Sequence, residues 1–384
     1  MSLFVNQIIA QDEQMLEIGI FRRYKSLKSI HFTPKDNSYK IYDEKDSLIY
    51  HLQKGEIASI RKSSNGRDVK LKVPDEDLGY YSKVRIVSDS KTATYTIKGH
   101  SPVTKSRKYY DGIECSVFSN RFNVVSLVSM AHYLEGVTES ESGNHQGKEY
   151  YKVQAIISRT YALKNIRKFR HEGFMLTDMV NCQVYLGKMY KNPKIIEAIS
   201  ETNGLVLVNT QMNFISAAFY SNSGGQTANS EDVWSKKVDY LRSVSDPFSN
   251  GKHNSVWKKT YTTSEYLAKL KKYYNYPIHK TDAKYFALHF TQHKRAKYFV
   301  SWDYHILLTD VRRDFKLKST FFTVTEKDGT VTIKGKGFGH GVGLSQEGAM
   351  NMCDAGYSFK DVLFFYYTGV HLIDKRQRDF FLAE

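Results

Sequence analysis

The sequence predicts an α+β protein, with a β-rich N-terminal domain over residues 1–122 and a mixed domain over residues 123–384. Up to about residue 98, apolar and polar residues alternate with the two-residue period of strands. From Val124 onward, apolar residues recur first at helical spacing. The chain has 384 residues, 41% hydrophobic and 25% charged, which is ordinary for a folded protein and long enough for two domains. No apolar run approaches the roughly 18 residues that a membrane helix needs.

The predicted strands of the N-terminal domain are short. Residues 16–21, 39–42 and 94–97 alternate clearly, and polar turns such as residues 64–66 separate them. Residues 1–11 contain a short apolar stretch without a basic leader. This segment is either the remainder of a trimmed signal peptide or a lead-in to the first strand.

Two helices are predicted at the start of the mixed domain. The first carries a stripe of Val125, Val128, Ala131, Leu134 and Val137. The second covers residues 148–169, with a stripe of Tyr151, Ala155, Ile156, Arg159, Ala162, Leu163 and Ile166. Between them, the polar residues 138–147 predict a loop, a natural place for a site at a groove.

Further along, strands and helices are interleaved. Residues 204–208 and 214–220 are strand-like, and Thr263–Tyr274 is a predicted helix. Residues 322–333 predict a hairpin, followed by a glycine-rich loop and a helix that ends near Gly356.

Charge and cysteine content limit the function classes. Lys+Arg 56 against Asp+Glu 40 gives a net charge of +16, which either attracts a polyanion (nucleic acid, anionic lipid or acidic wall polymer) or simply keeps the protein soluble. Nucleic acid is not predicted as a partner, because no helix-turn-helix, RNA-binding signature or zinc knuckle is present. Cys115, Cys182 and Cys353 lie too far apart for a disulfide framework or a zinc site, so no metal and no cofactor are predicted.

Polar segments marked by glycine stand out against this background. They are residues 136–141 (GVTESE) with 158–163 (SRTYAL), residues 219–234 (FYSNSGGQTANSEDVW) and residues 337–346 (GFGHGVGLSQ). Each glycine cluster could be no more than a turn that needs a positive φ. The last segment is not a nucleotide loop, because it lacks the P-loop Lys-Ser/Thr and the dinucleotide context.

Taken together and in this order, the segments resemble the sporulation protein D family (SpoIID/LytB), which comprises peptidoglycan lytic transglycosylases and amidase enhancers. The matching pieces are YLEGVTESE, QAIISRTYAL, YSNSGGQTANSEDVW, YLRSVSDP, FKLKSTFF and GKGFGHGVGLSQEGA. They extend from Tyr133 to Gly369, about three fifths of the chain.

The resemblance implies that residues 123–384 are a catalytic domain. It would cleave the β-1,4 bond between N-acetylmuramic acid and N-acetylglucosamine in peptide-stripped peptidoglycan strands, leaving a 1,6-anhydro end. The glutamate of the family's G-V-x-x-[SA]-E stretch falls on Glu141. Ser142-Gly143 replaces the usual Met-Pro, and Glu139 takes a position that is commonly Pro, so Glu139 and then Glu135 are the alternatives.

The chemistry supports a single acid. Cleavage of a glycosidic bond needs a proton donor, and a carboxylic acid that stays protonated near neutral pH suits this role. Hydrolases normally need a second carboxylate, whereas in a transglycosylase the muramic acid's own C6 hydroxyl attacks. If Glu135 and Glu139 lie close by, their charges are expected to raise the pKa of Glu141.

Other side chains are predicted to bind the substrate. Arg159 would orient Glu141 or bind an N-acetyl carbonyl or lactyl carboxylate, with a buried structural ion pair as the alternative. His340 would bind substrate or tune the charge near the acid, with a structural role as the alternative. Ser345 and Gln346 are predicted to start a helix, with Ser345 as its cap. The residues expected to line the sugar groove are Tyr220, Ser221, Ser223, Gly224 and Gln226, together with Ser345 and Gln346.

The leading prediction is therefore a lytic transglycosylase whose partner is the peptidoglycan glycan strand. The alternative is a non-catalytic wall-binding protein that enhances a separate cell-wall amidase. Either function predicts an exported protein of the periplasm or cell envelope, and the positive charge is compatible with a position near a membrane surface.

Overall fold

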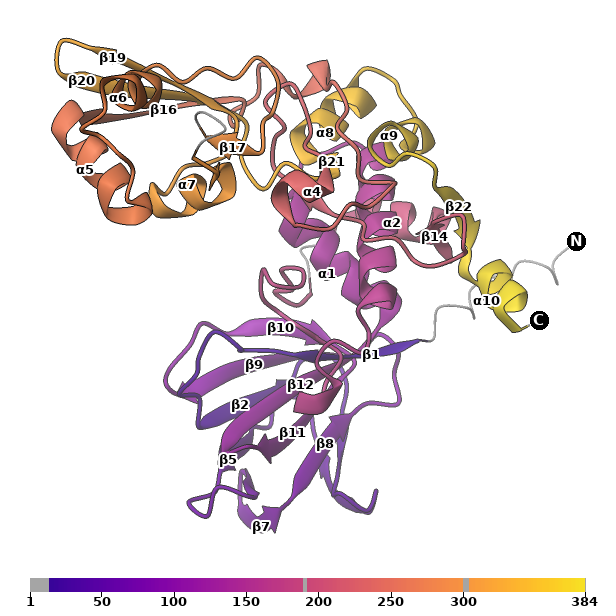
Figure 1. Cartoon of the computed structure of the whole chain (residues 1–384). Helices are drawn as coiled ribbons and strands as arrows, with labels where there is room; N and C mark the ends of the chain where they lie inside the picture. Colours follow the sequence, from indigo (N-terminus) through magenta and orange to yellow (C-terminus); the bar gives the residue numbers. More distant parts are fainter. Residues whose placement is uncertain (1–13, 189–191, 300–303, 384) are drawn as a thin grey trace, which may run out of the picture. The chain divides into compact units, whose positions relative to one another are not determined.

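The computed structural model describes residues 14–188, 192–299 and 304–383 (Figure 1). It confirms the predicted α+β class and the β-rich N-terminal region. Residues 1–11, for which a trimmed signal was considered, lie outside the described residues. The chain divides into two compact units, Met1–Val206 with Ile373–Glu384, and Leu207–Leu372. Within the described part of the chain, no helix is long and apolar enough to span a bilayer.

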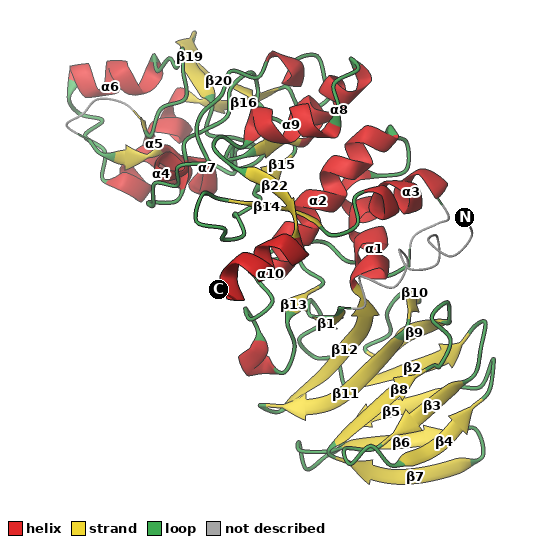
Figure 2. Ribbon diagram, turned by 90° about the vertical axis from the view of Figure 1, so that its right-hand side faces the viewer, coloured by secondary structure: helices red, strands yellow, loops and turns green. Residues whose placement is uncertain are grey.

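The first unit begins with two sheets that enclose one hydrophobic core (Figure 2). The alternation read from the sequence produces this core: in β2, Ile30 and Phe32 are buried while His31 and Thr33 are only partly covered. One sheet has the order β13-β1-β12-β11-β8-β3-β4, with β1 (Met15–Gly19), β3 (Tyr39–Tyr42), β4 (Leu48–Leu52), β8 (Lys83–Val87), β11 (Gly112–Phe118), β12 (Arg121–Ser129) and β13 (Leu176–Thr177). The other has the order β10-β9-β2-β5-β6-β7, with β2 (Ser29–Pro34), β5 (Ala58–Lys62), β6 (Val69–Val73), β7 (Glu76–Tyr81), β9 (Thr94–Ser101) and β10 (Arg107–Tyr110).

Helices follow the sheets within the same unit. They are α1 (Met130–Ser142), α2 (Lys148–Lys164), the 3-10 turn η1 (Arg170–Glu172), α3 (Pro193–Glu201) and, at the C-terminus, α10 (Lys375–Ala383). Strand β12 leads directly into α1, where the Ser129 hydroxyl caps the helix by accepting a hydrogen bond from the His132 N–H.

Two predictions in this region are wrong. Val125 and Val128 belong to β12 rather than to a helix, because that strand is buried on both faces and its apolar run mimics a helical stripe. The predicted loop at residues 138–147 begins only at Gly143, since α1 continues to Ser142. The predicted division between residues 122 and 123 falls inside β12, and as a boundary of function it stays a prediction.

The second unit contains a three-stranded sheet, β16-β20-β19, packed with α5, α6 and α7 around its own core. The predicted helix Thr263–Tyr274 and the predicted hairpin at residues 322–333 are confirmed; of the strand predicted at residues 214–220, only β15 forms. The helices are α4 (Ser230–Val233), η2 (Pro247–Ser249), α5 (Thr263–Tyr274), α6 (Thr281–Leu288), α7 (Leu308–Asp314), α8 (Gln346–Asp354) and α9 (Phe359–Tyr366). The strands are β14 (Leu205–Val208, which begins in the first unit), β15 (Phe219–Tyr220), β16 (Val256–Thr262), β17 (Tyr298–Phe299), β18 (Ile306–Leu307), β19 (Phe322–Lys327), β20 (Thr330–Lys336), β21 (Leu344–Ser345) and β22 (His371–Asp374, which ends in the first unit).

Candidate functional site

Glu141 lies in the last turn of α1, on a helix rather than in the loop predicted for it. Its side chain is half-buried, and the Val184 N–H donates a hydrogen bond of 2.8 Å to its Oε1. Val184 belongs to the segment that follows β13, so this carboxyl group is held between the end of α1 and a second piece of backbone.

Burial raises the pKa of Glu141, and the hydrogen bond from Val184 opposes this rise. The direction matches the prediction, but the predicted cause is wrong, since the rise comes from lost solvation and not from the charges of Glu135 and Glu139. Glu139 instead accepts a hydrogen bond from Asn144 Nδ2 at 2.6 Å. A carboxyl group that is withdrawn from water in this way keeps its proton to higher pH, as a proton donor requires.

The segment around Val184 is fixed closely against α1. A Cβ on Gly136 would lie 2.3 Å from the Gly187 carbonyl oxygen, so only glycine permits this approach. The Tyr133 hydroxyl donates to Gln183 Oε1 at 3.2 Å, in the interior. Sequence reasoning missed Gln183 and Val184, because a backbone N–H leaves no signal in side-chain identity.

Glu135, the remoter alternative, is in a different environment. Burial also raises its pKa, but His132, Lys188 and a hydrogen bond with Tyr110 stabilise its ionised form. For Glu141, burial raises the pKa and the hydrogen bond from the Val184 N–H opposes the rise. The choice of Glu141 over Glu135 as the acid stays a prediction, since burial raises the pKa of both carboxyl groups.

Arg159 is fully buried in α2. Its Nη1 donates to the carbonyl oxygens of Thr202 and Leu205, at 2.9 and 3.2 Å. These carbonyls lie at the C-terminal end of α3 and the start of β14, where helix and strand ends leave acceptors to be satisfied. Arg159 thus stabilises this connection. Its side chain has no exposed surface in this structure with which to make the predicted contact to a substrate.

In the second unit, the segments that contain SNSGG and GFGHGVGLSQ come together. Strands β15 and β21 pair in parallel, with Tyr220 opposite Ser345. Asn222 and Phe338 exchange backbone hydrogen bonds of 3.0 and 2.8 Å. The Ser223 N–H donates to Ser345 Oγ at 3.1 Å. Motifs about 120 residues apart in the sequence therefore build one local structure.

Several residues predicted to bind sugar are buried and make hydrogen bonds within the protein instead. Ser223 and Ser345 are fully buried, and Ser223 Oγ donates to Asp246 Oδ2 at 2.7 Å. Ser345 caps α8 as predicted, accepting from the Gly348 N–H. Gly224 has φ 67°, and a Cβ there would lie 2.5 Å from the carbonyl carbon of Lys336. Gln346 is nearly buried at 9% exposure.

Gln226 is also held by the protein. Its Oε1 accepts from the Arg295 N–H at 3.0 Å, and its Nε2 donates to Ser243 Oγ at 2.9 Å. Arg295 reaches further, to the Ser223 carbonyl, at 2.7 Å. Sequence reasoning missed Arg295, which lies outside every quoted motif. It also assigned no role to Glu347, which accepts from Asn222 Nδ2 at 2.6 Å.

His340 uses both ring nitrogens within the protein. Nδ1 accepts from the Val342 N–H at 3.1 Å, which assigns the proton to Nε2, 3.0 Å from the Phe219 carbonyl oxygen. Burial lowers the pKa of His340 to about 4, so the ring is neutral near pH 7. These hydrogen bonds agree with a structural role for His340, which was the alternative to substrate binding.

The ring of His340 is part of an aromatic group with surface access. Its centroid lies 5.1 Å from that of Tyr220 and 5.1 Å from that of Trp234. Tyr220 is buried, and burial raises its pKa. Trp234 is 39% exposed, and Ser221 is half-buried. Ser221, His340 and Trp234 are therefore among the residues of these motifs that can face a ligand. No cluster of three or more potential metal ligands occurs among the described residues.

Comparison with known proteins agrees with the resemblance of these motifs. Residues 118–209 match the sequence model of a family described as "Stage II sporulation protein". The chain is 28% identical over 302 residues to "Stage II sporulation protein D" of Bacillus amyloliquefaciens, covering 75% of this chain and 84% of that protein. It is 29% identical to an uncharacterised protein of Brachyspira hyodysenteriae, covering 70% of this chain and 73% of that one.

A further relative is the "Amidase enhancer" of Bacillus subtilis, which is 30% identical over 289 residues. That match covers 62% of this chain but only 40% of the longer relative. The family match includes α1 with Glu141, and the relatives extend the similarity over most of the chain. The chain is thus similar to sporulation protein D over most of its length and to part of the amidase enhancer.

Proposed function

We propose that this protein is a lytic transglycosylase that cleaves the glycan strands of peptidoglycan, with Glu141 as its acid and base. Similarity to sporulation protein D and to the amidase enhancer supports a role related to the cell wall or to sporulation. The observation that carries the finer proposal is the half-buried carboxyl group of Glu141, whose pKa burial raises. As parts of this proposal, the substrate is the peptide-stripped strand and the protein acts outside the cytoplasm, in the cell envelope.

The reaction needs one such group. Protonated Glu141 donates its proton to the glycosidic oxygen as the bond from C1 of N-acetylmuramic acid to that oxygen breaks. The C6 hydroxyl of the same sugar then attacks C1, and the Glu141 carboxylate accepts the hydroxyl proton. The net change moves one proton from O6 to the leaving oxygen and forms the 1,6-anhydro ring. Glu141 is regenerated, and no water or second carboxylate takes part.

The test compares the wild type with Glu141→Gln on purified, peptide-free glycan strands. Removal of a general acid costs roughly 100-fold or more, so 1,6-anhydro products in the mass spectrum should fall by at least that factor. Glu139→Gln is the matched control: its carboxylate lies on the same turn of α1 but is engaged by Asn144, and this variant should retain activity. Equal products from Glu141→Gln and wild type, or reducing ends in place of anhydro ends, would contradict the proposal.

The second candidate is a non-catalytic enhancer of a separate cell-wall amidase. It is favoured by the similarity to the protein named amidase enhancer. The two functions differ in their dependence on Glu141. If enhancement is the function, Glu141→Gln should stimulate a purified wall amidase as well as the wild type does, and neither protein should release anhydro sugars.

A further inference from the structure

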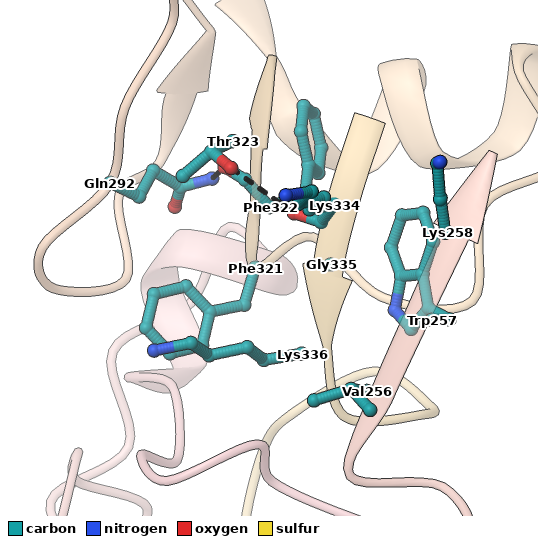
Figure 3. Close-up of a pocket in the computed structure, with 10 residues that line it drawn as sticks. All are labelled: Val256, Trp257, Lys258, Gln292, Phe321, Phe322, Thr323, Lys334, Gly335 and Lys336. Atoms are coloured by element: carbon teal, nitrogen blue, oxygen red, sulfur yellow. Dashed lines mark hydrogen bonds between the residues drawn. The ribbon is translucent and has the colours of Figure 1, made fainter. Parts of the chain in front are cut away.

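A pocket of about 530 Å³ lies at one end of the three-stranded sheet in the second unit (Figure 3). It has apolar side chains and a basic rim, and it contains none of the side chains predicted to act on or bind the glycan. Its lining consists of Val256, Trp257, Lys258, Gln292, Phe321, Phe322, Thr323, Lys334, Gly335 and Lys336.

The lysines of this pocket occupy one face of the sheet. Side chains alternate between faces along a strand, and the burial patterns of β16 and β20 follow that alternation. Lys258 pairs directly with Lys334 across the two strands, and Val256 pairs with Lys336. Lys258, Lys334 and Lys336 therefore share the exposed face, which we call the lysine face.

On β16, β19 and β20, no acidic side chain lies on the lysine face. The register places only Val, Thr and Lys side chains on the lysine face, from β16, β20 and β19 together. Within the described residues, neither Lys258 nor Lys334 forms an ion pair. Like charges directly opposite each other on neighbouring strands destabilise a sheet. The pair Lys258 and Lys334 is therefore unfavourable for the stability of the sheet. Unfavourable local arrangements of this kind are expected at functional sites, where a bound anion would neutralise the two positive charges.

The neighbouring apolar surface suits a ligand with a carbon framework. Val256 is 68% exposed, although it is a large apolar side chain at the edge of the pocket. On the opposite face of the sheet, the Trp257 ring covers Gly335, where a Cβ would lie 2.0 Å from the ring atoms, so the strands that form the floor of the pocket are closely packed. Gln292 is fixed by donating to the carbonyls of Thr320 and Phe322, at 2.9 and 3.1 Å. The backbone around the pocket is thus held in place by contacts within the protein, and the lysines lie at its rim.

We propose that this pocket binds a polyol chain linked by phosphodiester groups, an anionic polymer of the cell wall. A glycan strand carries at most one carboxylate for every two sugars, so it would present one charge to three lysines. A polyol phosphate carries a negative charge at every repeat, which matches lysines about 5 Å apart across the strands. The choice of a wall polymer over another phosphodiester rests on the proposed function; the lysine face itself does not.

The test measures binding of purified poly(glycerol phosphate) to the full chain by calorimetry, at low and at physiological salt. The variant is Lys258→Gln with Lys334→Gln. Each lysine beside an anionic surface changes affinity on the order of fivefold, so the double variant should bind roughly tenfold or more weakly. The remaining affinity should also fall less steeply with salt. Its thermal midpoint should not fall, because both side chains are exposed.

The matched control removes two charges elsewhere, by Lys28→Gln with Arg61→Gln. These residues line a second basic pocket of about 450 Å³ in the first unit. Poly(glycerol phosphate) affinity should change less than about threefold in this control. An equal loss in both double variants would mean that bulk charge alone drives binding, and the proposal would be wrong.

Two further ligands distinguish the source of the anion. A single-stranded oligonucleotide of equal charge, or peptide-free glycan, that binds as tightly with the same dependence on Lys258 and Lys334 would overturn the choice of a polyol phosphate. All titrations are repeated in Glu141→Gln, which should bind the polymer like the wild type. The lysine variant should cleave glycan normally, so a failed cleavage assay and a failed binding assay can be told apart.

Discussion

At the scale of single residues, burial sets the pKa values of the titratable side chains in the candidate site. Glu141 and His340 are both half-buried, and burial favours the neutral form of each. For Glu141 this means a proton that is held to higher pH than in an exposed glutamate. For His340 it means a lost proton and a ring whose nitrogens are committed to the Val342 N–H and the Phe219 carbonyl.

The lowered pKa of His340 predicts a pH dependence of stability. The unfolded chain binds a proton at this residue near pH 6.5, whereas the folded chain binds it only near pH 4. Between these values the unfolded state holds more protons, so the contribution of His340 to stability is complete above pH 6.5 and is lost as the pH falls toward 4. The loss should be about 2 kcal/mol, allowing for partial exposure.

This prediction is checked by urea unfolding at several pH values. The wild type should lose more stability between about pH 6.5 and 4 than His340→Asn, which carries no titrating ring. His145→Asn, in the loop after α1, is a control that should follow the wild type. Parallel pH profiles for the wild type and His340→Asn would contradict the burial argument.

At the scale of elements, helix α1 is positioned by a close backbone approach. Alanine normally stabilises a helix relative to glycine by about 1 kcal/mol. At position 136, however, a Cβ would lie 2.3 Å from the Gly187 carbonyl oxygen and 2.8 Å from the Tyr185 ring. The clash should outweigh the helix propensity.

Gly136→Ala is therefore expected to destabilise the protein by about 1–3 kcal/mol in chemical unfolding. It should also lower glycan cleavage, because the segment that holds Val184 against Glu141 must shift. Gly147→Ala, at the start of α2, meets no atom within 4 Å and serves as the control. A stabilised Gly136→Ala variant would show that this contact is not tight in solution.

At the scale of the whole molecule, each of the two units contains a hydrophobic core of its own. Ile60 is fully buried in the core of the sandwich, and Ile333 is buried in the core of the lysine-bearing sheet. Since each cluster lies within one unit, a cavity in one core should weaken that unit first.

Hydrogen exchange tests this expectation peptide by peptide. Ile60→Ala should cost about 2–5 kcal/mol and speed exchange in the strands of residues 15–129, while exchange in α5 and β19–β20 stays slow. Ile333→Ala should give the opposite pattern. Uniformly faster exchange across the chain in either variant would indicate a single cooperative unit instead.

Periodicity was most reliable where one face of an element is solvent-exposed. The helix Thr263–Tyr274 and the hairpin of β19 and β20 were predicted correctly, because polar side chains mark their outer faces. Periodicity failed at β12, whose residues are covered on both sides and carry no such mark. The same limit placed Glu141 in a loop, since Glu139, Ser140 and Ser142 look like loop residues although they extend a helix.

The sequence by itself predicted the α+β class, the resemblance to the sporulation protein D family and Glu141 as a candidate acid. These follow from local periodicity and from motifs that are continuous in the chain. Only the tertiary structure decided which motif residues face a ligand. Burial and hydrogen bonding assign Arg159, Ser223 and Ser345 to the interior, because their partners come from distant segments. The raised pKa of Glu141 was likewise decided there, since desolvation depends on what packs around a side chain and not on its neighbours in sequence.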